Sequence, residues 1–155
     1  NIGNKKIIRD KVKNGPKVFM EKMDYTIVEY YKNYANVENF EEDQYKLIYL
    51  ALSLDMKGIK HNDPNPLNIM IKDNEFYYID FGMSTDISVD DNFPNIRALH
   101  SLFYGGMQGI YTRRKTLKRI KSEPKIVEKY YELVKTNPES IVKTFMEEYS
   151  NRKQY

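Results

Sequence analysis

The pattern of hydrophobic and polar positions predicts a chain built mainly of helices. Its clearest helix covers 41–57, where hydrophobic residues recur at three- and four-residue spacing. Gly58 follows directly, and glycine is the preferred residue just past a helix end. The predicted buried face of this helix consists of Tyr45, Ile48, Leu52 and Met56, flanked by Leu47, Ala51 and Leu54.

Three short strands are predicted in the first half of the chain. The runs 68–71 and 75–79 are rich in Ile, Phe and Tyr, and they flank Lys72-Asp73-Asn74, a sequence typical of a tight hairpin turn. Lys17-Val18-Phe19-Met20 is a further apolar run, and Gly15-Pro16 before it indicates a turn.

Most of the remaining chain is predicted to be helical, apart from a polar loop over 83–93. Pro94 begins one of these helices, and Gly105-Gly106 closes it. Asn137 is the predicted N-cap of the last helix, with Pro138 at its first position. The order of elements predicts an α+β fold dominated by helix, in one domain that covers 1–155. These further helices are expected over 25–31, 94–104, 111–120, 124–134 and 138–150.

Composition narrows the class of protein. Hydrophobic residues make up 41% of the chain and charged residues 30%, a balance typical of soluble globular domains. No run of eighteen apolar residues and no secretory signal is found, so we expect no membrane partner. The absence of cysteine excludes disulfides and thiolate metal sites and agrees with a reducing, cytoplasmic location.

The charge is unevenly distributed, although the net charge is only +3. The segment 113–121 contains six basic residues and no acidic one. One interpretation is a solvated helix face, and the other is a patch that binds phosphate-rich partners such as RNA. The basic residues are Arg113, Arg114, Lys115, Lys118, Arg119 and Lys121.

Two short motifs carry the candidate chemistry. In the first, Asp63 follows His61 by two residues and Asn68 follows Asp63 by five. In the second, Asp80-Phe81-Gly82 comes twelve residues after Asn68, across the predicted hairpin. Phosphoryl transfer needs a carboxylate that orients the acceptor hydroxyl and oxygen ligands that hold Mg²⁺ against the nucleotide phosphates. Asp63, Asn68 and Asp80 supply those groups.

The two motifs, in this order and at this separation, resemble the protein-kinase superfamily. The resemblance implies a protein-kinase-like C-lobe with a small catalytic-loop β-hairpin, and an enzyme that uses ATP and Mg²⁺. It implies that Asp63 is the catalytic base or hydroxyl-orienting carboxylate. It implies that Asn68 and Asp80 are the Mg²⁺ ligands, and that a protein is the substrate or partner.

The resemblance gives structural roles to other residues of the motifs. It implies that His61 packs and hydrogen-bonds within the loop without transferring a proton. Phe81 is expected to pack, and Gly82 to permit the turn. The segment with Glu21 and Met23 resembles the hinge whose backbone binds adenine, so these two residues are the cofactor-binding candidates.

The chain departs from conventional protein kinases at several positions. Asn62 replaces the arginine that reads activation-loop phosphate, so we expect no control of that kind. Asn65 stands where protein kinases carry a phosphate-contacting lysine, and with Pro66 it is closer to small-molecule phosphotransferases. Asn95 lies near the place where the family's next helix carries an anchoring aspartate. Only about a dozen residues separate Gly82 from the helix at Pro94, too few for a peptide-docking activation segment.

The short segment is similar to that of the atypical kinases, RIO and the small kinase subunit of the KEOPS tRNA-modification complex. The strings 79–84 and 144–150 look like the latter. The resemblance covers roughly 17–150, the C-lobe, and no Gly-rich phosphate loop or lysine-bearing strand of an N-lobe is found. The leading hypothesis is therefore an atypical serine/threonine-kinase-like phosphotransferase. The alternatives are a non-catalytic, kinase-derived binding module and a small-molecule kinase.

Overall fold

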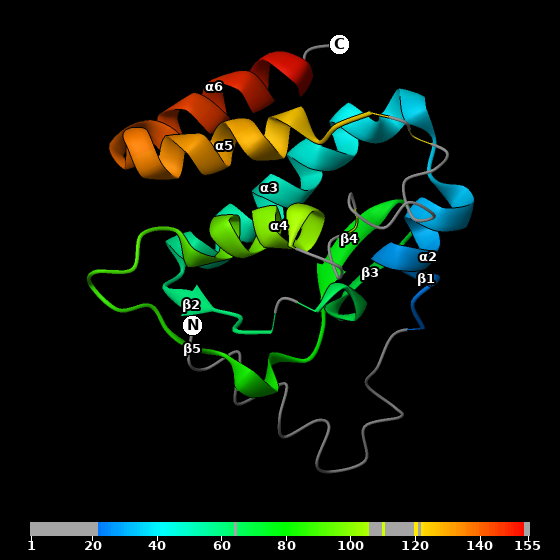
Figure 1. Cartoon of the computed structure of the whole chain (residues 1–155), viewed down its shortest axis with the longest axis horizontal. Coiled ribbons are helices and arrows are strands. Elements are labelled where there is room, and N and C mark those ends of the chain that lie inside the picture. Colours follow the sequence, from blue (N-terminus) through cyan, green and yellow to red (C-terminus); the bar gives the residue numbers. More distant parts are fainter. Residues whose placement is uncertain (1–21, 64, 106–109, 111–119, 121, 154–155) are drawn as a thin grey trace.

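The computed structural model describes residues 22–63, 65–105, 110, 120 and 122–153. Helices dominate these residues and two small antiparallel sheets accompany them, which confirms the predicted α+β class (Figure 1). The strands are β1 (Tyr25–Thr26), β2 (Ile59–Lys60), β3 (Ile69–Lys72), β4 (Glu75–Tyr78) and β5 (Thr85–Asp86). The α-helices are α2 (Ile27–Glu29), α3 (Phe40–Met56), α4 (Pro94–Tyr104), α5 (Lys125–Thr136) and α6 (Ile141–Lys153). The π-helix η2 (Tyr30–Tyr34) and the 3-10 turns η3 (Val37–Asn39), η4 (Pro66–Asn68), η5 (Phe81–Met83) and η7 (Pro138–Ser140) complete the set.

Helix α3 lies at the centre of the packing. It contacts α4, α5 and β4, while α5 and α6 lie side by side and cover it from one side (Figure 1). The predicted buried face of α3 is confirmed except at its end, where Leu54 is half-buried and Met56, the last residue of α3, is 62% exposed. The largest fully buried side chains of these helices and of η2 are Tyr31, Leu47, Ile48, Leu99, Phe103, Tyr130 and Phe145.

The start of α5 is capped by a side chain from another helix. Pro124 occupies the N-cap position and provides no side-chain hydrogen bond. Instead, Oε1 of the buried Gln44 on α3 accepts hydrogen bonds from Ile126 N (2.8 Å) and Val127 N (3.2 Å). These two amides lie in the first turn and lack partners within their own helix. Gln44 therefore fixes the start of α5 to α3.

The hairpin prediction is confirmed, with the turn at Asp73 and Asn74. Both residues have positive φ, 52° and 64°, which matches the turn that suits the right-handed twist of two paired strands. The register pairs Ile69 with Tyr78 and Lys72 with Glu75. Strand β1 pairs with the other edge of β3, so the sheet order is β1-β3-β4.

Three local predictions are wrong in part. The segment 25–31 is helical only from Ile27, because Tyr25 and Thr26 pair with β3 and the capping box of Thr26 with Glu29 begins the helix there. Asn137 makes no side-chain cap; α6 begins only at Ile141, after a 3-10 turn. The loop 83–93 contains the two-residue strand β5, which pairs with β2.

Some predictions fall on residues outside the described ones. They are the strand 17–20, the helix 111–120 apart from Ile120, and the basic residues from Arg113 to Lys121. Among the described residues, no helix is both long enough and apolar enough to cross a membrane.

Candidate functional site

Asp63 lies in the loop that follows α3 and β2. Gly58, with φ of 74°, ends the helix and turns the chain into β2. Asp63 is half-buried, and its backbone N donates to Nδ1 of His61 (3.3 Å). The position of Asp63 is thus tied to the ring of His61.

The β3–β4 hairpin brings Asn68 and Asp80 together. Asn68 immediately precedes β3, and Ile79 immediately follows β4. The Ile79 N–H donates to the Asn68 carbonyl (2.9 Å), so the two chain segments are hydrogen-bonded to each other one residue before Asp80. Residues twelve apart in the sequence therefore lie beside one another.

Asp80 has an unusual backbone conformation, which its own side chain supports. Its φ and ψ are 56° and 75°, in the left-handed region that aspartate tolerates better than most residues. Its Oδ1 accepts from Gly82 N (3.3 Å) and begins the turn η5. A Cβ at Gly82 would lie only 3.2 Å from the same Oδ1, so a glycine leaves room for the carboxylate.

His61 connects the Asp63 loop to the Asp80 segment. Its side chain is buried, and Nε2 lies 2.8 Å from the carbonyl oxygen of Ile79. Since Nδ1 accepts from Asp63 N, the two contacts fit the neutral tautomer with the proton on Nε2. The ring stacks on Tyr78 at 5.0 Å between centroids, and Phe81 contacts it edge-on at 4.9 Å. These contacts place His61 in a structural position between Asp63 and Asp80.

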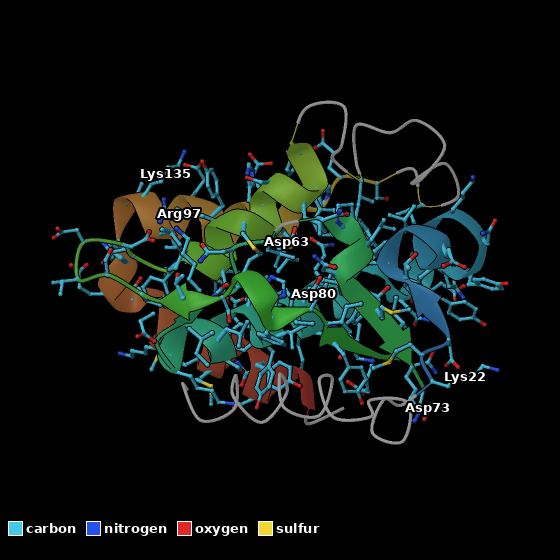
Figure 2. The ribbon with its side chains drawn as sticks, turned by 90° about the horizontal axis from the view of Figure 1, so that it is seen from below. Lys22, Asp63, Asp73, Asp80, Arg97 and Lys135 are labelled. Atoms are coloured by element: carbon cyan, nitrogen blue, oxygen red, sulfur yellow. The ribbon has the colours of Figure 1, made fainter. Side chains whose placement is uncertain are left out.

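Asp63 and Asp80 lie together near the middle of Figure 2, with α4 on the Asp63 side. Both belong to segments that His61 holds, and neither carries a direct ion pair with a basic residue among the described residues. Neither carboxylate is therefore neutralised by a direct ion pair within the described part of the chain.

Asn95, at the start of α4, anchors the loop that carries Asp63. Its Oδ1 accepts from His61 N (3.0 Å), and its Nδ2 donates to Ile59 O (2.6 Å) and to Asp55 Oδ1 (2.8 Å). Asp55, in the last turn of α3, also accepts from the backbone N of Asn95 and of Ile96. Asn95 and Asp55 together therefore tie the loop that carries Asp63 to the end of α3 and the start of α4.

Sequence reasoning missed Asp55. A lone aspartate near a helix end is a common surface residue, and its three N–H donors all come from the start of α4, about forty residues later in the chain. Asn95 itself was the one signal in the sequence that pointed to Asp55. An amide can donate a hydrogen bond to a nearby carboxylate, whereas a carboxylate at the same position would repel it.

Asn62 fixes the segment that follows Asp80. It has φ of 68°, a conformation in which asparagine is several-fold enriched among residues other than glycine. Its Nδ2 donates to Met83 O (3.1 Å) and to Thr85 Oγ1 (2.6 Å). A direct side-chain link thus holds the loop against β2.

Fewer contacts define the positions of the remaining site candidates. Met23 is half-buried and lies one residue before Asp24, whose N–H donates to Ile71 O of β3 (2.9 Å). Met23 therefore lies beside the sheet edge opposite β4. Glu21 and the basic run, Arg113, Arg114, Lys115, Lys118, Arg119 and Lys121, lie outside the described residues.

A pocket of about 260 Å³ opens beside Asp63. Residues that follow β2, including Asp63 and Asn65, form one wall, and one face of α4 forms the other. The α4 wall includes the core side chains Leu99 and Leu102, both under 5% exposed. The pocket therefore lies between the half-buried Asp63 and the hydrophobic core.

Asn68 and Asp80 offer an amide oxygen and a carboxylate, which are types of ligand that magnesium accepts. Among the described residues, no group of three or more histidines and carboxylates gathers in a way that could hold a metal ion alone. Magnesium is usually held by one or two carboxylates, with water and phosphate oxygens in its other positions. Asp80 and the amide oxygen of Asn68 match that pattern.

Comparison with protein-family models, with curated proteins and with solved structures finds no match for this chain. The functional conclusion therefore depends on the residues and geometry described above.

Proposed function

We propose that this chain is the catalytic C-lobe of an ATP- and Mg²⁺-dependent phosphotransferase of atypical protein-kinase type. One observation carries the proposal: the hairpin joins Asn68 to the Asp80 segment, and His61 joins that segment to Asp63. Phosphoryl transfer depends on positioned charge more than on covalent chemistry, and these three side chains are the charges and ligands it requires.

Each side chain has one task in the proposed reaction. The acceptor hydroxyl oxygen bonds to the γ-phosphorus, the bond from phosphorus to the β,γ-bridging oxygen breaks, and ADP leaves with that electron pair. Asp63 orients the hydroxyl and receives its proton. Asn68 and Asp80 would hold the magnesium ion, which when bound offsets negative charge on the phosphate oxygens.

The test compares three aspartate-to-asparagine variants in the protein expressed from its complete coding sequence. D63N and D80N should each lower phosphate transfer by about 100-fold or more. D80N should also weaken Mg²⁺-dependent ATP binding in isothermal titration, whereas D63N should leave it nearly unchanged. D73N is the matched control, because Asp73 lies at the exposed hairpin tip away from the other two (Figure 2). Undiminished transfer in D80N would contradict the proposal.

A non-catalytic binding module is the second candidate. It is favoured by the sequence itself, since these 155 residues contain no Gly-rich loop to cover a triphosphate. The same titration separates the two, because a module of that kind should bind neither ATP nor Mg²⁺–ATP. Binding in the micromolar range that D80N removes would argue against it.

A further inference from the structure

The pocket beside Asp63 has the properties of an acceptor-binding subsite. Asp63 lies at its edge, so a group bound in the pocket has its neighbouring atoms next to the carboxylate that orients the acceptor hydroxyl. The α4 side is formed by Pro94, Ala98, Leu99 and Leu102, together with the amide residue Asn95, and none of these side chains carries a charge.

The charges around the pocket limit what it can accept. Among the described residues that line it, Lys60 is the only charged side chain besides Asp63, and Lys60 is paired with Asp91 (3.1 Å). An anionic acceptor would meet the Asp63 carboxylate with no basic partner available in the lining. A neutral, apolar group gains from contact with Leu99 and Leu102 and meets no such repulsion.

The size of the pocket limits the acceptor further. Sites that enclose a whole small-molecule ligand usually measure about 300–1,000 Å³. At about 260 Å³ and open to solvent, this pocket matches one large apolar side chain better than a complete metabolite. An extended peptide leaves its backbone outside such a pocket and inserts alternate side chains.

Resting on the phosphotransferase function proposed above, the geometry points to a peptide substrate whose Ser or Thr hydroxyl is presented at Asp63 by a neighbouring large apolar residue. That residue, such as Leu or Phe, enters the pocket between loop residues 60–63 and α4. Specificity then comes from the face of α4 and not from a long docking segment after Gly82.

The experiment measures peptide binding without nucleotide, by fluorescence anisotropy of labelled serine peptides that differ only in the residue beside the serine. Leu should bind about tenfold more tightly than Ala, and Asp should bind no better than Ala. A98W should abolish the preference for Leu by filling the pocket. S101W is the matched control, since Ser101 is exposed on the same helix and does not line the pocket.

A second measurement uses the unmodified protein, so its result is independent of how any variant folds. In the unmodified protein, the Leu peptide should shift the methyl resonances of Ala98, Leu99 and Leu102, and the Ala peptide should not. Equal binding of all peptides, or shifts confined to other methyl groups, would overturn the inference. Displacement of the labelled Leu peptide by benzyl alcohol, at a lower concentration than unlabelled Leu peptide requires, would overturn it too. The acceptor would then be a small hydroxyl compound.

Failure of the inference can be told apart from failure of the proposed function. Phosphate transfer to every serine peptide alike, with no Leu preference, would leave a phosphotransferase without this subsite. Leu-selective binding without any transfer would leave the subsite in a protein that does not catalyse.

Discussion

Asp55 in the last turn of α3 accepts two hydrogen bonds from Asn95 at the start of α4, from Nδ2 (2.8 Å) and from the backbone N (2.9 Å). The same side chain of Asn95 accepts from His61 N and donates to Ile59 O. One amide therefore links two helices to the loop that carries Asp63. An amide suits this position because its Nδ2 donates both to Asp55 and to Ile59 O while its Oδ1 accepts from His61 N, whereas a carboxylate could only accept.

Replacement of Asn95 by aspartate tests this link. N95D places a second carboxylate against Asp55 and removes the donor to Ile59 O. Burial already raises the pKa of Asp55 to about 6, so two adjacent carboxylates cannot both ionise there cheaply. We expect N95D to lose about 2–4 kcal/mol of unfolding free energy at pH 7 in urea titrations, and to lose less at pH 5.

The control for N95D is a second substitution in the same pair. D55N in the N95D background removes the repulsion and supplies an amide donor, so it should restore part of the lost stability. D55N alone should cost less than N95D alone. Additive effects in this double-mutant cycle would contradict the direct pairing of the two side chains.

Asp43 predicts a pH dependence of stability. It is 3% exposed on α3 and accepts hydrogen bonds from the hydroxyls of Tyr30 (2.9 Å) and Tyr31 (3.5 Å). Burial raises its pKa from 3.8 to about 6, although the two hydroxyls and nearby Lys46 act in the opposite direction. The folded state therefore holds this proton more tightly than the unfolded state does.

The sign of the effect follows from linkage. Between about pH 4 and pH 6 the unfolded chain has released the Asp43 proton while the folded chain retains it, so a rise in pH favours unfolding. D43N removes this contribution, of about 1–3 kcal/mol, and should flatten the decline in unfolding free energy across that window. D24N, at an exposed aspartate, should leave the decline unchanged. Parallel curves for D43N and the unmodified protein would show that Asp43 does not titrate there.

The hydrogen bonds of Gln44 are predicted to stabilise the start of α5. Its Oε1 accepts from two first-turn amides that Pro124 cannot cap, so Q44L leaves buried donors without a partner. We expect Q44L to lower the unfolding free energy by about 1–3 kcal/mol and to speed hydrogen exchange at Ile126 and Val127. Q44E keeps the acceptor oxygens and should lose less. Unchanged hydrogen exchange at Ile126 and Val127 in Q44L would contradict the capping role of Gln44.

Local patterns predict the helices and the hairpin because each depends on residues close in the sequence. The hairpin turn at Asp73 and Asn74 and the helix end at Gly58 are examples. The pairing of β2 with β5 and the cap of α5 by Gln44 could not be predicted this way, since each joins residues far apart that carry no distinctive pattern. Within the site, motif spacing predicts which residues to examine, but the link through Asp55 depends on how α3 and α4 pack.

The last prediction concerns Asn62, whose side chain donates to Met83 O and Thr85 Oγ1. These bonds hold the loop after Asp80 without any phosphate group. Phosphatase treatment of the protein should therefore leave the proposed phosphate-transfer activity unchanged. N62A removes both bonds and places alanine at φ of 68°, while N62G removes the bonds without backbone strain. Both variants should therefore increase hydrogen exchange at Ser84 and Ile87, and N62A should be the less stable by about 1 kcal/mol. Exchange that rises in N62A but not in N62G would assign the effect to the backbone conformation and not to the two hydrogen bonds.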